Sequence, residues 1–127
     1  DIANRGGNFI NVIHKTAILQ GNVSLGTGII LCPFCCVNDH ATVGNHVMLN
    51  IKSSLGHDCI VGDYTCMMGN VSIDGFVRIG RLTYWGDGAV ALPESKIDDN
   101  AFVGTKSVVY KHVRAGQKVL GNPALPI

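Results

Sequence analysis

The feature that most constrains this chain is a six-residue period that runs without a break from Val12 to Val113. Seventeen consecutive blocks of six fit the period, so the repeat covers 102 of the 127 residues. The second position of every block is apolar, and the sixth is always small or β-branched. Any fold assigned to the chain has to explain this repeat first. Glycine fills the third position in seven blocks: Gly26, Gly44, Gly56, Gly62, Gly80, Gly86 and Gly104.

A six-residue period is incompatible with a helix, whose apolar stripe recurs about every 3.6 residues. The period fits a strand, because strand side chains alternate between two faces and six is a multiple of two. Each block is then a short strand and a corner, with the second-position residue pointing inward. We expect the third-position glycines to supply corner backbone angles that a Cβ would forbid. Such units wind into a solenoid whose coils stack as parallel ladders.

Composition limits the functions open to such a solenoid. Ten basic and nine acidic side chains give a net charge of +1, so no clustered positive charge marks a nucleic-acid or anionic-membrane surface. No apolar run approaches the roughly 18 residues that a membrane-spanning helix needs, and the first residues do not resemble a signal peptide. The five cysteines are an odd number, which argues against a disulfide framework and favours the reducing cytoplasm.

The repeated pattern of an aliphatic residue, glycine and a small residue resembles the hexapeptide-repeat acyltransferases. Three stretches, Ala41-Thr42-Val43-Gly44, Gly56-His57-Asp58-Cys59 and Gly121-Asn122-Pro123-Ala124, are similar to the sialic acid O-acetyltransferases and UDP-4-amino-sugar N-acetyltransferases of that family. The resemblance implies an all-β fold, a single-stranded left-handed parallel β-helix with three blocks per coil and about six coils. We expect a lead-in over residues 1–11, the β-helix over 12–113 and a tail over 114–127.

Three blocks per coil place residue n beside residue n+18 and predict three inward ladders. The first ladder is Ile13, Leu31, Leu49, Met67, Trp85 and Val103. The second is Leu19, Val37, Leu55, Ile73, Ala91 and Val109. The third is Leu25, Val43, Val61, Ile79 and Ile97. We expect Ala91, the smallest member of its ladder, to make room for Trp85 in the same coil. Cys35 and Cys59 occupy the small sixth position.

The resemblance implies an acetyltransferase that moves an acetyl group from acetyl-CoA to an amine or hydroxyl of a sugar or nucleotide sugar. His57, in the fourth and outward position of its block, matches the general base of the family. Free histidine has a pKa of about 6.5, so an imidazole can take a proton from the nucleophile at neutral pH. Asp58 would complete the catalytic pair by holding one tautomer. Because adjacent strand residues point to opposite faces, this pairing requires a corner between them.

Other residues are candidates for binding. Asp39, the ladder neighbour of His57, is a second candidate for orienting the imidazole, and we group it with Asn50 as a candidate substrate contact. Asn50 matches an acceptor-binding position of the family, and its alternative is a stacked asparagine at a corner. Gly75 lies beside His57 on the next coil and leaves room for a pantetheine arm. The positions that match acetyl-CoA contacts, mostly through backbone atoms, are Cys66, Gly75, Asp87, Gly104 and Thr105.

The family is typically trimeric, with the active site between neighbouring prisms, so we expect a homotrimer. Two features depart from the family pattern. Cys66 stands where a second histidine often follows nine residues after the first, and the eleven residues before the repeat are too few for the N-terminal nucleotide-sugar domain of the family. Either that domain has been removed, or the chain acts on a different acceptor. A non-catalytic binding or scaffold solenoid is therefore an alternative function.

A metal-dependent lyase is a third alternative, because some left-handed β-helices are zinc carbonic anhydrases. His40, His46 and His57 would be the ligands. His40 and His46 occupy the fifth position on adjacent faces and His57 the fourth, so we do not expect them to converge within one chain. The stretch Cys32-Pro33-Phe34-Cys35 has the spacing of a redox or zinc motif, yet no second pair follows it. Packing of small thiols explains these cysteines equally well. We therefore expect no bound metal.

Overall fold

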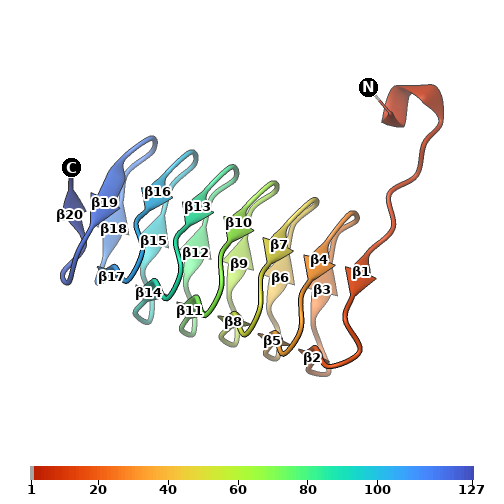
Figure 1. Ribbon diagram of the computed structural model, residues 1–127, viewed down its shortest axis with the longest axis horizontal. Helices are drawn as coiled ribbons and strands as arrows, with labels where there is room; N and C mark the ends of the chain where they lie inside the picture. Colours follow the sequence, from red (N-terminus) through yellow and green to blue (C-terminus); the bar gives the residue numbers. More distant parts are fainter. Residues whose placement is uncertain (1) are drawn as a thin grey trace.

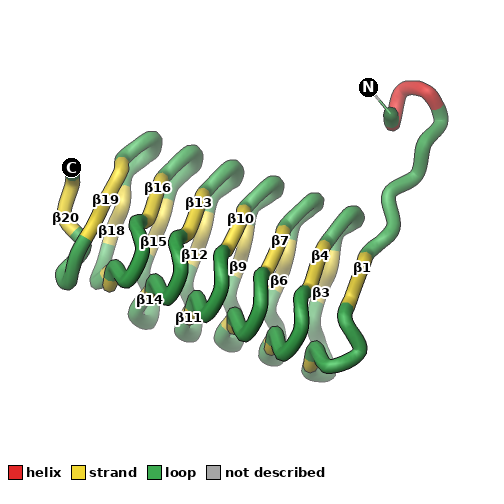
Figure 2. The backbone as a smooth tube through the Cα atoms, viewed as in Figure 1, coloured by secondary structure: helices red, strands yellow, loops and turns green. Residues whose placement is uncertain are grey.

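The computed structural model describes residues 2–127, and from Val12 onward the chain forms a three-sided prism (Figure 1). Strands of two or three residues alternate with longer corners along the whole prism, as Figure 2 shows. The chain passes from sheet A to sheet B to sheet C and returns to sheet A, so each strand of the coils pairs in parallel with the strand three further along. The winding is left-handed, and the predicted parallel β-helix of about six coils is confirmed.

Each sheet is a stack of short strands. Sheet A contains β1 (Val12–Ile13), β4 (Ile30–Leu31), β7 (Met48–Leu49), β10 (Cys66–Met67), β13 (Tyr84–Trp85), β16 (Phe102–Val103), β19 (Lys118–Leu120) and β20 (Leu125–Pro126). Sheet B contains β2 (Ile18–Leu19), β5 (Cys36–Val37), β8 (Ser54–Leu55), β11 (Ser72–Ile73), β14 (Val90–Ala91) and β17 (Val108–Val109). Sheet C contains β3 (Ser24–Leu25), β6 (Thr42–Val43), β9 (Ile60–Val61), β12 (Arg78–Ile79), β15 (Lys96–Ile97) and β18 (His112–Val113).

Three corners join the sheets, and we name each by the two sheets that it connects. The AB corner comprises residues 14–17, 32–35, 50–53, 68–71, 86–89 and 104–107. The BC corner comprises residues 20–23, 38–41, 56–59, 74–77, 92–95 and 110–111. The CA corner comprises residues 26–29, 44–47, 62–65, 80–83, 98–101 and 114–117.

The three predicted inward ladders are confirmed by the strand pairing. In steps of one coil, they run from Ile13 to Val103 in sheet A, from Leu19 to Val109 in sheet B and from Leu25 to Ile97 in sheet C. From the second coil onward their side chains fill one continuous core, together with the small sixth-position residues, whereas Ile13 and Leu19 of the first coil are exposed. Among the latter, Cys35 and Cys59 are buried, as predicted.

Trp85 is the largest side chain of this core and is fully buried. Its indole N–H donates to the Thr83 hydroxyl at 3.1 Å, so burial leaves no polar atom of the ring without a partner. Ala91, on the next strand of the same coil, is also fully buried. A methyl group opposite an indole is the arrangement expected where one layer compensates a large side chain with a small one.

The corners obtain their unusual backbone from the fifth position of the block. Twelve non-glycine residues have φ between 56° and 64°, and every one of them occupies that position. The predicted role of the third-position glycines in supplying such angles is therefore wrong. Glycine is needed there because the next coil approaches closely, since a Cβ on Gly62 would lie 2.6 Å from the backbone nitrogen of Arg81.

The winding continues past Val113, where the repeat ends in the sequence. Only Tyr110 and Lys111 separate β17 from β18, so Val113 pairs with Ile97 at an offset shorter than a full coil and is buried. Residues 114–127, which we expected to form a tail, add β19 to sheet A and β20 antiparallel to it. The shortened corner ends the six-residue period without ending the solenoid.

The segment before β1 runs away from the prism and includes the 3₁₀ helix η1 (Ala3–Arg5) (Figure 1). Asn11 connects this segment to the first coil, because its side-chain oxygen accepts the backbone N–H of Ile29 at 3.0 Å. Phe9 contacts the ring of His46 edge-on, with 4.6 Å between ring centroids. No helix within residues 2–127 is long and apolar enough to cross a membrane.

Candidate active site

His57 and Asp58 form a hydrogen-bonded pair on the BC corner, directly after β8. The Nδ1 atom of His57 lies 2.9 Å from Oδ2 of Asp58. Asp58 has a φ of 58°, and this left-handed turn brings two adjacent side chains to the same side of the backbone. The corner that the sequence required between them is therefore present.

The contact with Asp58 determines which nitrogen of the His57 imidazole carries the proton, and it adds little to the stability of the fold. The side chains are 57% and 40% exposed, and exposed ion pairs contribute little to folding. A carboxylate can only accept hydrogen bonds, so a neutral His57 that bonds to Asp58 carries its proton on Nδ1. The lone pair of Nε2 is then available to accept a proton from another molecule.

Gly75 makes the position of the imidazole possible. A Cβ on this residue would lie 2.6 Å from Nε2 and 2.7 Å from Cε1 of His57. No real side chain tolerates such distances, so the ring rests over the next coil only because that coil carries glycine here. We expected Gly75 to leave space for a ligand, and in the structure the same space also accommodates the imidazole edge that carries Nε2.

Asp39 lies on the BC corner one coil before His57, but its carboxylate points elsewhere. It accepts the backbone N–H groups of Asn22 at 2.9 Å and of His40 at 3.1 Å. The hydrogen bond from Asn22 is the main cause that lowers the pKa of Asp39 below its usual value. Asp39 is bonded to the preceding coil and to its own turn, and the residue that orients His57 in this structure is Asp58.

The other predicted contacts lie on a different edge of the prism. Asn50, Asp87, Gly104 and Thr105 all belong to the AB corner, and Cys66 begins β10 in sheet A. Two of these side chains already have partners within the chain. The side-chain oxygen of Asn50 accepts the N–H of Ile51 at 2.7 Å, and that of Asp87 accepts the N–H of Gly69 at 3.1 Å. Burial raises the pKa of the Cys66 thiol.

The predicted site residues therefore form two groups within one chain. His57, Asp58 and Gly75 lie together on the BC corner, whereas the AB-corner group is separated from them by the width of sheet B. A ligand that touches both groups of one chain would have to cross that face.

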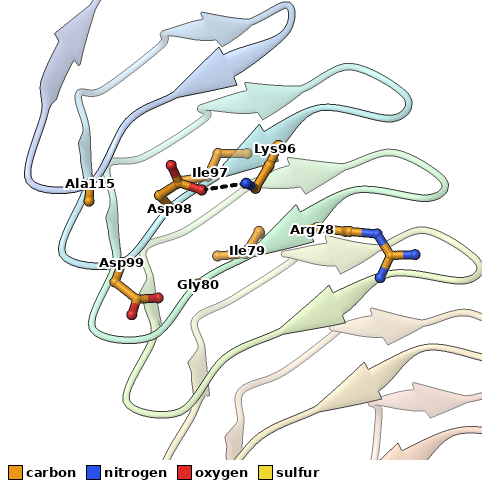
Figure 3. Close-up of a pocket in the computed structure, with 8 residues that line it drawn as sticks. All are labelled: Arg78, Ile79, Gly80, Lys96, Ile97, Asp98, Asp99 and Ala115. Atoms are coloured by element: carbon orange, nitrogen blue, oxygen red, sulfur yellow. Dashed lines mark ion pairs between the residues drawn. The ribbon is translucent and has the colours of Figure 1, made fainter.

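Two hollows lie near the C-terminal end of the prism. One, of about 400 Å³, lies between β12, β15 and the CA corner, and its Lys96 and Asp98 form an ion pair at 3.2 Å (Figure 3). Asp98 also contacts Nε2 of His112 at 2.8 Å, and these contacts lower its pKa. The second, of about 480 Å³, is lined by Pro93 and Glu94 of the BC corner, among others. It begins one coil beyond Gly75, on the edge that carries His57.

The histidines do not form a metal centre within the described residues. His46 is on the CA corner, between the rings of Phe9 and Tyr64, whereas His40 and His57 are on the BC corner. Across residues 2–127, no three His, Cys, Asp or Glu side chains are placed to hold one metal ion. The thiol of Cys35 contacts the backbone carbonyl of Asn50 at 3.1 Å, and all five cysteines, each within the described residues, are free.

Known proteins share this fold and part of this sequence, although no protein-family model matches the chain. GDP-perosamine N-acetyltransferase of Escherichia coli O157:H7 is 33% identical over 120 residues, which are 91% of this chain and 54% of that protein. PerB from Caulobacter crescentus, solved in complex with CoA and GDP-perosamine, has a TM-score of 0.97 at 25% identity. The match covers 98% of this chain and 60% of PerB. The chain belongs to the hexapeptide-repeat acyltransferases.

A further member of the fold is WeeI from Acinetobacter baumannii AYE, which is 31% identical with a TM-score of 0.82. That match covers 99% of this hexapeptide-repeat chain and 62% of WeeI. The chain spans about half the length of the E. coli relative. The substrates named for these relatives therefore belong to proteins that contain sequence beyond the part matched by this chain.

Analysis of the sequence missed one residue beside His57. The ring of Phe76 lies 5.0 Å from the imidazole at an interplanar angle of 89°. Ladder reasoning pairs His57 with Gly75, one full coil later, and Phe76 follows Gly75 directly in the chain. The sequence offered one indication of this contact, namely an aromatic residue directly after Gly75, the ladder partner of His57.

Proposed function

We propose that this chain is an acetyl-CoA-dependent N-acetyltransferase domain whose acceptor is the amine of a nucleotide-linked amino sugar, with His57 as general base. The single observation that carries the proposal is the His57–Asp58 pair, in which Nδ1 bonds to Asp58 while Nε2 lies against Gly75 and has no hydrogen bond within the described residues. The E. coli relative at 33% identity is named as an N-acetyltransferase of a GDP-linked amino sugar, which favours an amine over a hydroxyl acceptor.

His57 would move one proton twice. Its Nε2 accepts a proton from the amine as the amine nitrogen bonds to the thioester carbonyl carbon. When the carbon–sulfur bond breaks, the imidazolium returns that proton to the departing thiolate, so the products are the acetamide and free CoA. Asp58 stabilises the imidazolium through Nδ1 at 2.9 Å, where its carboxylate lies before the reaction begins.

The residues near His57 fit a thin thioester arm. Gly75 presents no side chain toward the imidazole, and the BC corner leads from there to the hollow beside Pro93 and Glu94. We propose backbone contacts with acetyl-CoA at Gly75 and, on the other edge, at Cys66, Asp87, Gly104 and Thr105. Asn50 and Asp39 remain the proposed acceptor contacts, although the carboxylate of Asp39 already accepts two backbone N–H groups.

The separation of the two groups supports a homotrimer. The BC corner of one copy would face the AB corner of its neighbour, so that each complete site uses both. The outer side of sheet A suits such packing, because Val12, Ile30, Tyr84 and Phe102 are exposed apolar or aromatic side chains there. Closed cyclic symmetry is the usual arrangement for such assemblies. We expect sedimentation to show a trimer.

A thiol-release assay tests the proposal. Purified protein is given acetyl-CoA with a panel of nucleotide-linked amino sugars, their hydroxyl counterparts and free amino sugars, and product is identified by mass spectrometry. We expect release of CoA with an amino-sugar nucleotide and not with the hydroxyl counterpart. Equal CoA release by the wild type and by His57→Ala would refute the role of His57. Absence of acetyl-CoA binding by calorimetry would instead favour a non-catalytic solenoid.

A further inference from the structure

The imidazole of His57 needs more than one restraint to keep Nε2 over Gly75. The side chain is more than half exposed, and exposed side chains exchange rotamers on a picosecond-to-nanosecond scale. Asp58 holds only Nδ1, so the ring can still rotate about that contact. Gly75 gives the imidazole edge space but offers no side chain to hold it.

Phe76 supplies the missing contact. Its ring lies perpendicular to the imidazole with 5.0 Å between centroids, which is a favourable geometry for two aromatic rings. Its backbone N–H donates to the carbonyl oxygen of His57 at 3.0 Å, so the two residues are fixed to each other through the main chain as well. Phe76 belongs to no core layer, because its side chain is 52% exposed.

We propose that Phe76 is a positioning residue for His57, whose ring keeps Nε2 over Gly75 and Nδ1 on Asp58. The proposal rests on the general-base role of His57 for its effect on catalysis, whereas the restraint on the ring stands on geometry alone. Phe76 touches the base and not the reacting atoms, so its contribution lies in the fraction of time that the imidazole spends in the productive orientation.

The CA corner provides a matched control. Tyr64 occupies the same position of the block as Phe76, also with a left-handed φ, and it contacts His46. That pair is stacked at an interplanar angle of 15°, and His46 has no carboxylate partner among the hydrogen bonds of the described residues. Removal of Tyr64 therefore deletes an aromatic–histidine contact at the same ring separation of 5.0 Å, though in stacked geometry, on an edge without the proposed base.

The experiment follows the imidazole nitrogens of His57 by NMR in the full chain, together with steady-state kinetics. The wild type should show one tautomer, with the proton on Nδ1. In Phe76→Ala we expect averaged tautomer signals and a fall in kcat of about tenfold, with KM for acetyl-CoA within about twofold. Phe76→Tyr should restore both values, and Tyr64→Ala should leave both unchanged. Circular dichroism verifies folding, and Phe76→Leu replaces Phe76→Ala if the latter does not fold.

The proposal is overturned if the ring-deleted variant keeps either the wild-type tautomer signal or the wild-type kcat. It is also overturned if Tyr64→Ala produces the same losses, because the effect would then belong to corners in general. An inactive wild type would defeat the proposed function, and the nitrogen signals would still decide whether Phe76 holds the ring.

Discussion

The CA and BC corners share one backbone conformation but use the fourth position of the block differently. In the CA corner, Asn45, Asp63 and Asp99 each accept a backbone N–H from the residue 18 positions earlier, at 2.8 to 3.0 Å. Each of these oxygens joins its coil to the coil before it. The polar residue at this position is therefore structural in three of the six coils of the CA corner.

The BC corner begins in the same way and then departs. Asp39 bonds to the preceding coil through the N–H of Asn22, but one coil later the position holds His57, whose ring turns to Asp58 instead. The following coil has Gly75, which offers no oxygen to bond back. The comparison shows how a repetitive solenoid frees a side chain for chemistry: one coil omits the stacking bond, and the next omits the side chain.

The strongest test of this difference exchanges each histidine for alanine. We expect His57→Ala to lower kcat by about 10²- to 10⁴-fold, the usual contribution of a general base. His46→Ala removes a histidine of the other edge and should leave kcat within about threefold. Both variants are compared by CoA release after circular dichroism has verified folding. Similar losses in the two variants would show that the edges are not functionally different.

Glycine-to-alanine substitutions should separate activity from stability. Gly75→Ala places a methyl group against the flexible imidazole, so we expect kcat to fall about 10²-fold with little change in Tm. Gly44→Ala, on the CA corner, places its Cβ 2.8 Å from the backbone nitrogen of Asp63. That clash should cost about 1–3 kcal/mol of unfolding free energy and spare activity per folded molecule. Thermal melts and kinetics on both variants measure this, and a reversed pattern would contradict it.

Aspartate-to-asparagine substitutions give a smaller effect. In Asp58→Asn, a neutral amide replaces the carboxylate that we propose stabilises the His57 imidazolium, so kcat should fall about tenfold. Asp63→Asn keeps an oxygen that can accept the N–H of Asn45, and its unfolding free energy should stay within about 0.5 kcal/mol of the wild type. Chemical denaturation and CoA release are the measurements. A loss of activity in Asp63→Asn alone would invert the assignment of the corners.

The dependence of stability on pH should reveal the two carboxylates whose pKa values are lowered in the folded protein, Asp39 and Asp98. The pKa of Asp39 is lowered mainly by the N–H of Asn22, and that of Asp98 by the side chains of His112 and Lys96. In both cases the stabilisation is present above the unfolded pKa of about 3.9 and is lost as the pH falls through the folded pKa. Unfolding free energy, measured by chemical denaturation at a series of pH values from 6 downward, should therefore fall less steeply with pH in Asp39→Asn and in Asp98→Asn than in the wild type.

High salt sharpens the same comparison. Salt screens the charged partners of Asp98, Lys96 and His112, whereas the main partner of Asp39 is the uncharged backbone N–H of Asn22 and His40 is a lesser one, so 1 M salt should reduce the effect of Asp98→Asn more than that of Asp39→Asn. If salt removes the difference from the wild type equally in both variants, the backbone hydrogen bond from Asn22 is not the main cause of the lowered pKa of Asp39.

Much of the fold followed from the repeat once the family resemblance supplied a coil of three blocks. A coil of that size placed Met67 between Leu49 and Trp85, and the repeat selected Cys35 and Cys59 as core residues. The same reasoning failed at the last coil. The short corner at Tyr110 and Lys111 shifts the pairing to less than a full coil, and no column of the repeat indicates such a deletion.

The site was predicted less completely, because side-chain direction depends on contacts that a period does not describe. Asp39 and Asp58 were both candidates for orienting His57. The left-handed φ of Asp58 and the bond of Asp39 to Asn22 decide between them. Phe76 escaped notice because it meets His57 from the residue beside the ladder partner.

The sequence by itself determined which residues point inward and which position of the repeat holds the candidate base, since both follow from counting in sixes, and the family resemblance then grouped the blocks in threes. Only the tertiary structure decided which carboxylate holds the imidazole, which ring restrains it and how far the winding continues. Those outcomes depend on φ angles at single corners and on hydrogen bonds between coils, and neither is periodic in the sequence.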